Sequence, residues 1–154
     1  MKYNYINIYN NLIKLTRNKK LYINLGKQDT FSERLIFLFF HFAIFLKHFK
    51  SSIPPENLQK IFDFVISQIE ISIREVGYGD VSVNKNMKFL VKSFYSILFF
   101  CEKYEKKSKE YKKTFFKQYL VKINNKKVDY NDNLVNYFND YQTFCFDLSS
   151  DSVL

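Results

Sequence analysis

Residues 31–50 read FSERLIFLFFHFAIFLKHFK, and this stretch decides the fold that the rest of the sequence must accommodate. Its apolar run from Leu35 to Leu46 is interrupted only by His41 and contains neither glycine nor proline. This run of about twelve residues is too short to cross a bilayer as a helix, which takes about 20. The run therefore predicts a helix that is buried in the core of a soluble domain.

The sequence on either side of this stretch predicts five further helices. Only three glycines and two prolines occur in 154 residues, so long segments lack the residues that end helices. Apolar residues recur at helical spacing in the segments 6–16, 55–76, 83–107, 111–123 and 131–146. We therefore expect an all-α, single-domain bundle of about six helices. The predicted domain spans 1–148, and a flexible tail is expected at 149–154.

Local signals predict where several of these helices begin and end. Asp29 or Thr30 is expected to cap the helix that starts at residue 31. Pro54-Pro55 suits the start of the third helix, because proline is tolerated in a first turn. Gly77 can take the left-handed conformation that the end of this helix requires. Ser82 is expected to cap the helix that follows.

The second and third helices are joined by a short link, so they are expected to form an antiparallel hairpin over residues 31–76. In such a hairpin Arg34 falls opposite Glu70, and His41 falls opposite Asp63. A buried charge is tolerated only when it is paired. We therefore expect a structural network of these four side chains, which would set the register of the hairpin.

A catalytic or metal site at His41 is the alternative, and its signals are missing. His41 and His48 lack a carboxylate at metal-ligand spacing, and no nucleophile is marked beside the expected His41–Asp63 pair. Cys101 and Cys145 also lack metal spacing, and we expect both to be free thiols. The sequence therefore predicts no metal, no cofactor and no catalytic residue.

A more specific signal follows the third helix. Residues 73–83 read IREVGYGDVSV, and Lys85 and Met87 come soon after. This run resembles the signature of the ubiquinol-cytochrome c chaperone family, and the likeness extends over about residues 9–100. Further residues agree with the family in order: Tyr9, Arg17, Leu21-Tyr22, Asp29-Thr30, Arg34, Leu38, His41, Phe62-Asp63, Glu70, Phe94 and Tyr95. The chain departs from the family's pattern at Lys27-Gln28 and at Ser32-Glu33.

The resemblance implies a non-catalytic assembly chaperone that binds newly made cytochrome b for biogenesis of the bc1 complex, respiratory complex III. It also implies work near the ribosome exit with a small partner protein. The matching region begins by about residue 9, which leaves no room for a transit peptide and favours the bacterial form of the family. We therefore expect a cytoplasmic protein, peripheral to the inner membrane and without a transmembrane helix.

The signature run is expected to form a tight corner between the third and fourth helices. It can be purely structural, with Arg74 binding loop carbonyls and Asp80 or Ser82 capping the next helix. It can also be a docking surface, with Tyr78 exposed as an aromatic anchor beside charged side chains. The predicted partner-binding residues are Arg74, Glu75, Gly77, Tyr78, Gly79, Asp80, Ser82 and Lys85.

The net charge of +9 gathers in one segment, since residues 102–127 carry ten lysines against three glutamates. The predicted basic stripe consists of Lys103, Lys106, Lys107, Lys109, Lys112 and Lys113, with Tyr104 and Tyr111 between them. Such a stripe suits polyanions, so the alternative function is a basic helical module that binds nucleic acid or ribosomal RNA. The other interpretation is that lysine merely covers a solvated face.

Phenylalanine is abundant for so small a domain, which raises the question of where its rings lie. The residues concerned are Phe37, Phe39, Phe40, Phe42, Phe45, Phe99, Phe100, Phe115 and Phe116. If some remain exposed together, the apolar patch would mark the site where the client is held. The alternative is that they fill the core.

Overall fold

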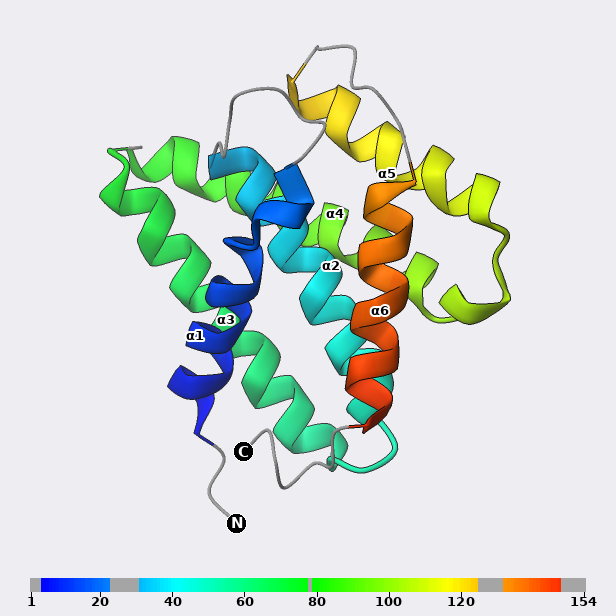
Figure 1. The fold of residues 1–154 in the computed structure, drawn as a ribbon. Coiled ribbons are helices and arrows are strands. Elements are labelled where there is room, and N and C mark those ends of the chain that lie inside the picture. The colour runs from blue at the N-terminus through cyan, green and yellow to red at the C-terminus, as the bar shows by residue number, and fades with distance from the viewer. Residues whose placement is uncertain (1–3, 23–30, 78, 125–131, 148–154) are drawn as a thin grey trace.

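The computed structural model describes residues 4–22, 31–77, 79–124 and 132–147, and these residues form six α-helices without a strand (Figure 1). The helices are α1 Tyr5–Thr16, α2 Phe31–Phe49, α3 Pro55–Glu75, α4 Asp80–Cys101, α5 Lys109–Asn124 and α6 Asn133–Asp147. Two short 3-10 turns lie between them, η1 at Lys19–Tyr22 and η2 at Tyr104–Lys106. The prediction of an all-α bundle of six helices is confirmed.

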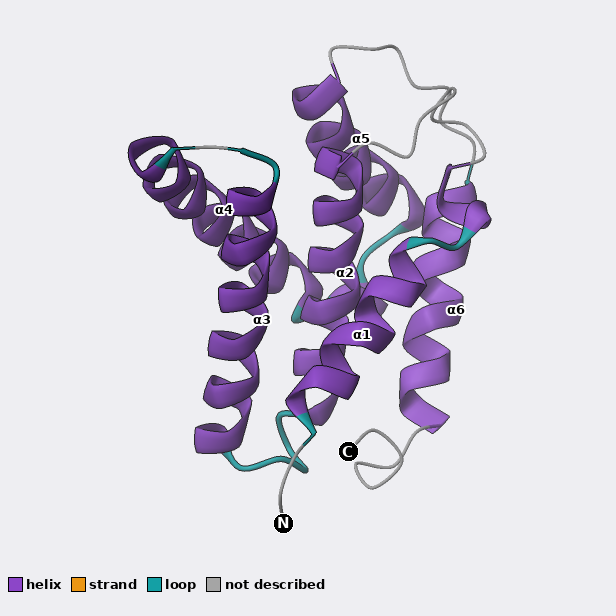
Figure 2. Ribbon diagram, turned by 90° about the vertical axis from the view of Figure 1, so that its left-hand side faces the viewer, coloured by secondary structure: helices purple, strands orange, loops and turns teal. Residues whose placement is uncertain are grey.

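Helix α2 is the centre of the fold. It lies between α4 on one side and α1 and α6 on the other, and α5 also packs against it (Figure 2). Every residue from Leu35 to Phe45 is buried, which confirms the prediction of a core helix. Each fully buried phenylalanine contributes about 1.5–3 kcal/mol through the removal of its ring from water.

Helices α2 and α3 run antiparallel and form the predicted hairpin (Figure 1). They touch through side chains such as Phe42 and Phe62, whose ring centroids lie 6.5 Å apart. Most of the packing of α3 is against α4 and α1, each of which also contacts α2. The stripe that α3 buries consists of Ile61, Val65, Ile69 and Ile73, spaced four residues apart.

The ends of α3 agree with the sequence signals. Pro54 is the N-cap residue and Pro55 the first helical residue. Gly77 has a φ of 104° directly after the C-cap Val76, so it takes the left-handed conformation that was predicted. The cap predicted at Asp29 or Thr30 lies outside the described residues, as does the predicted tail at 149–154.

The prediction for the fourth helix is wrong at both ends. Helix α4 begins at Asp80 with Gly79 as its N-cap, so Ser82 lies inside the first turn and does not cap it. Gly79 has the extended backbone that is usual for an N-cap residue. Its carbonyl oxygen accepts the first helical hydrogen bond, from Val83 N at 2.8 Å. The helix ends at Cys101, after which the chain turns and Tyr104 is buried.

The phenylalanines mainly fill the core. Phe40 is a hub whose ring packs against four other phenylalanine rings, with Phe116 at 4.7 Å and Phe138 at 5.4 Å between centroids. Seven of the nine are buried, namely Phe37, Phe39, Phe40, Phe42, Phe45, Phe100 and Phe116. Phe115 is half-buried and Phe99 is exposed. A shared apolar patch of these rings is therefore not formed.

Candidate functional site

One arginine contacts both helices at the corner between α3 and α4. Arg74, in the last turn of α3, donates hydrogen bonds to Glu70 Oε1 at 3.2 Å and to Asp80 Oδ1 at the start of α4. The bonds to Asp80 and then to Glu70 raise the pKa of Arg74 above its ordinary value. Arg74 therefore forms ion pairs with carboxylates on both helices of the corner. The expected contact of Arg74 with carbonyl groups of the loop stays a prediction.

The corner presents itself to solvent. Its described residues are exposed, namely Arg74, Glu75, Gly77, Gly79, Asp80, Ser82 and Lys85. Two apolar side chains flank the bend, Val76 with 59% of its surface exposed and Val81 with 84%. Sequence reasoning did not include these valines in the site, although their positions directly beside the glycine bend could have indicated them. Tyr78, the predicted aromatic anchor, lies outside the described residues.

The two glycines of the corner differ in what the fold requires of them. Gly77 needs its conformational freedom, because its φ of 104° is strained for any residue with a side chain. Gly79 has an ordinary negative φ, and an added Cβ would meet no atom within 4 Å. The fold itself therefore accounts for Gly77 but not for Gly79.

The predicted pairing of His41 with Asp63 is wrong. His41 is fully buried, with Nδ1 2.6 Å from the carbonyl oxygen of Phe37 and Nε2 2.7 Å from the hydroxyl of Tyr137 on α6. Asp63 is exposed and accepts a hydrogen bond from Gln59 at 2.9 Å. The reason is that α6, and not the polar side of α3, covers this part of α2.

Burial keeps the His41 ring neutral. It lowers the pKa to about 4, although the hydrogen bond to Phe37 acts in the opposite direction. A carbonyl oxygen can only accept, so Nδ1 carries the proton and Nε2 accepts from the hydroxyl of Tyr137. The phenol of Tyr141 adds a hydrogen bond to the carbonyl of His41 at 3.3 Å. His41 thus joins α2 to α6 as a structural residue.

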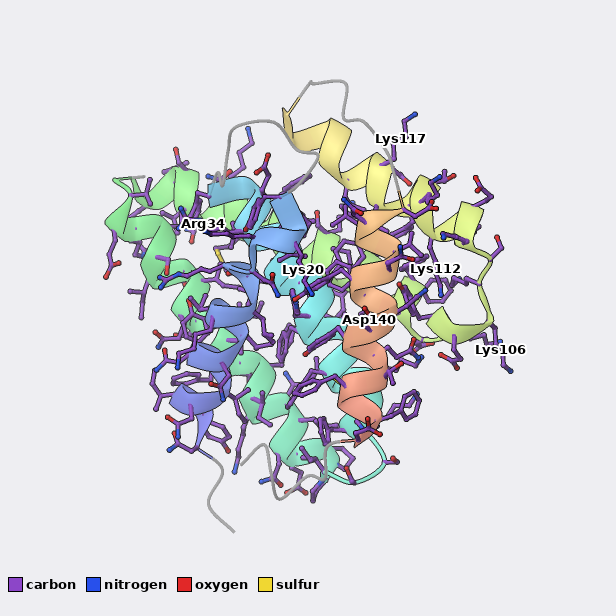
Figure 3. The ribbon with its side chains drawn as sticks, viewed as in Figure 1. Lys20, Arg34, Lys106, Lys112, Lys117 and Asp140 are labelled. Atoms are coloured by element: carbon purple, nitrogen blue, oxygen red, sulfur yellow. The ribbon has the colours of Figure 1, made fainter. Side chains whose placement is uncertain are left out.

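The predicted cross-helix pair of Arg34 and Glu70 is also wrong for the described part of the chain. Glu70 forms its ion pair with Arg74, one turn further along its own helix. A partner at this spacing on the same helix is always within reach, whereas a partner on α2 depends on how closely the helices approach. Arg34 lies on the exposed surface of α2 (Figure 3).

The six lysines of the predicted basic stripe do not share one free surface. Lys112 is buried beside α6, with Nζ 3.0 Å from Asn139 Oδ1 and 4.0 Å from the centre of the Tyr104 ring (Figure 3). Lys109 and Lys113 each lie 3.0 Å from the carboxylate of Asp132.

Of the other three lysines of the basic stripe, one contacts aromatic rings and two are exposed. Lys107 lies over the rings of Phe100 and Tyr111, at 5.1 and 4.8 Å from their centroids. Lys103 and Lys106 are exposed. Four of the six lysines therefore contact acidic, amide or aromatic groups of the protein itself.

A metal site or a thiol nucleophile would appear in the structure as clustered ligand side chains or as an ionised cysteine. Among the residues that it describes, no three His, Cys, Asp or Glu side chains gather closely enough to hold a metal ion. Cys101 and Cys145 are free, as predicted, and buried. Burial raises the pKa of Cys101 to about 12 and that of Cys145 to about 11, so both are protonated thiols at neutral pH.

The fold and the site define a small helical protein whose distinctive polar groups gather at one exposed helix–helix corner. A family model described as Ubiquinol-cytochrome C chaperone matches residues 24–112, which is more than half of the chain and includes the whole corner. The chain therefore belongs to the ubiquinol-cytochrome C chaperone family, as its sequence motifs suggest. Comparison with curated proteins and with solved structures gave no match.

Membership in this family indicates a chaperone role in assembly of the bc1 complex, and such a role implies a client protein. The matched region contains α2, α3 and α4 and ends early in α5. Within the described ranges, no helix combines the length and the apolar character needed to cross a membrane.

Proposed function

We propose that this protein is a non-catalytic assembly chaperone that binds newly made cytochrome b during biogenesis of the bc1 complex. The observation that carries the proposal is the family match over residues 24–112, because it covers the hairpin and the corner together. The core explains the apolar residues of this region. It does not explain why an ordered set of charges is presented to solvent at the bend.

The corner serves as the docking surface for a protein partner. Arg74 holds Glu70 and Asp80 in a fixed arrangement, and the exposed valines on both sides of the bend add apolar area. Such a combination of an arginine with apolar and aromatic groups is typical of the energetic centres of protein interfaces. The predicted aromatic group is Tyr78, and Gly79 leaves room for a partner to approach the backbone.

The cellular setting follows the resemblance. We place the protein in the cytoplasm, peripheral to the inner membrane, with a small partner protein and with contact to the ribosome near its exit. The alternative of a nucleic-acid or ribosomal-RNA-binding module finds less support, because four lysines of the predicted stripe are engaged within the protein. Ribosome contact through Lys103 and Lys106 is compatible with the chaperone role.

Deletion of the gene tests the proposal. We expect the loss of assembled bc1 complex and a lower level of cytochrome b, both measured in isolated membranes, with recovery when the intact gene is returned. Normal levels of both after deletion would remove the assignment.

A complementation variant tests the corner. Arg74→Ala with Tyr78→Ala should fail to restore the complex, although the purified variant melts at nearly the wild-type temperature. Lys60→Ala with Tyr111→Ala is the matched control, since both of its residues are exposed and lie away from the bend. Full complementation by the corner variant would show that the corner is only a helix connection.

A further inference from the structure

Helix α4 has an outward side that the other described helices leave largely exposed. The α4 outer face consists of Lys85, Lys88, Phe89, Lys92, Tyr95 and Phe99, all of them exposed. These positions recur at spacings of three and four residues, so they follow one side of the helix, which has 22 residues and is about 33 Å long. The opposite side is buried through Val83, Phe94, Ile97 and Phe100.

The aromatic rings on this face are costly to leave in water. Phe99 has 78% of its surface exposed and Phe89 has 60%. Tyr95 is exposed as well, and it stacks on Phe62 of α3 with ring centroids 5.9 Å apart. Apolar side chains that gather on one surface of a small protein usually mark a place where something else binds.

The charge on the same face has one sign. Between residues 81 and 101 the sequence has Lys85, Lys88 and Lys92 and no acidic residue. The acidic residue at the start of the helix, Asp80, is paired with Arg74. The α4 outer face therefore offers three positive charges interleaved with three aromatic rings.

We propose that the α4 outer face rests on the surface of a membrane that contains anionic lipids. Lysine ammonium groups would contact the headgroups while their apolar stems lie along the helix. Phenylalanine and tyrosine rings would enter the region between headgroups and acyl chains, where amphipathic surface helices bind. Each lysine close to an anionic leaflet strengthens binding about fivefold, so three together supply about a hundredfold.

The composition of the face favours a lipid surface over other polyanions and over a protein. Lysine is depleted from the centres of protein–protein interfaces, whereas here it alternates with the aromatic rings. Nucleic-acid surfaces favour arginine, whose planar group binds phosphate with two hydrogen bonds, and α4 contains no arginine. A single convex helix also lacks the groove that follows a nucleic-acid strand.

This assignment deepens the proposed function and rests on it for its biological purpose. The corner lies at the start of α4, so a molecule that rests on the α4 outer face holds its docking surface at the level of the membrane. Helices α1 and α6 lie on the opposite side of α2 and face away from the lipid (Figure 2). A client that is itself a membrane protein would meet the corner where it enters the bilayer.

Vesicle co-sedimentation with the purified full chain tests the assignment. We expect binding to vesicles of equal parts phosphatidylglycerol and phosphatidylcholine, weaker binding as salt is added, and little binding to phosphatidylcholine alone. The variant Lys85→Glu, Lys88→Glu, Lys92→Glu should lose at least about a hundredfold in affinity. Phe89→Ser with Phe99→Ser should reduce the binding that remains at high salt.

A matched control makes an equal change in net charge at another place on the protein. Lys14→Glu, Lys19→Glu, Lys20→Glu alters three exposed lysines on the α1 side and should keep most of the vesicle binding. If the glutamate variant of α4 does not fold, the same three positions changed to glutamine give the measurement with a smaller loss.

Three results would overturn the assignment. The first is equal binding to anionic and neutral vesicles, and the second is an equal loss of vesicle binding in the control variant. The third concerns a short single-stranded RNA as the competing ligand: the α4 glutamate variant would lose binding to this RNA but keep its binding to vesicles. None of them touches the chaperone proposal, because the deletion experiment measures the bc1 complex directly. Loss of the complex on deletion together with no vesicle binding would leave the chaperone role and remove the membrane-facing role of α4.

Discussion

Acidification should destabilise the folded protein through one buried side chain, His41. In the unfolded chain its imidazole takes up a proton near pH 6.5, whereas burial in the folded protein lowers the pKa to about 4. The folded pKa of this base is depressed, so the unfolded state binds more protons than the folded state between these two values. The contribution of His41 to stability is therefore full above pH 6.5 and is lost as the pH falls towards 4.

The size of the effect follows from the same pKa difference. At about 1.4 kcal/mol per pH unit, the interval from 6.5 to 4 corresponds to about 3 kcal/mol. This is a large part of the free energy of unfolding of a small domain, which is about 5–15 kcal/mol. The loss arises mainly because burial would shield a charged imidazole from water. A charged imidazole also could not accept the hydrogen bond from Tyr137.

Urea unfolding followed by circular dichroism across this pH range measures the loss. His41→Gln removes the titrating group, so its stability should depend less on pH than that of the wild type by about 3 kcal/mol. His48→Gln is the control, since His48 is only partly buried on the same helix. NMR titration of the native protein gives a second measurement, in which the His41 ring should stay neutral at pH 5.5, about one unit below its ordinary pKa. Equal pH dependence in wild type and His41→Gln, or a native His41 ring that titrates near pH 6.5, would refute the reasoning.

Three further predictions concern packing, backbone and thiols. Phe40→Ala should lower the free energy of unfolding by about 3–5 kcal/mol in urea titrations, because its ring joins α2 to α4, α5 and α6. Gly77→Ala should cost about 1–2 kcal/mol, whereas Gly79→Ala should melt close to the wild type, since only Gly77 has a positive φ. Cys101 and Cys145 should resist a thiol reagent in the native protein and react once it is unfolded, because both are buried with raised pKa values.

Much of the corner could be read from the sequence, because its signals are local. A glycine after an amphipathic stretch indicates a helix end, and Gly77 has the left-handed conformation that this pattern predicts. The local signals do not select one N-cap for α4, since Gly79, Asp80 and Ser82 are all acceptable N-cap residues. In the structure the N-cap is Gly79, whose carbonyl oxygen accepts the first hydrogen bond of α4.

The pairing of charged groups could not be obtained in this way. The expected network assumed that α3 turns its polar side towards α2, but α3 uses its isoleucine and valine stripe for packing and leaves Asp63 in solvent. The lysines after α4 are likewise close together in the sequence but do not share one surface in the folded protein. In the folded protein Lys112 is drawn inward by Asn139 of α6, while Lys106 points away from the molecule (Figure 3).

The amino-acid sequence by itself was enough to predict a helical protein with α2 in its core and a tight bend between α3 and α4. These features depend on periodicity and on glycine and proline, which act over a few residues. The partner of His41 was decided only by packing, since Tyr137 stands 96 residues away and reaches it because α6 covers that side of α2. The α4 outer face was decided in the same way, because the sequence of an apolar helix does not say which of its sides the other helices will leave uncovered.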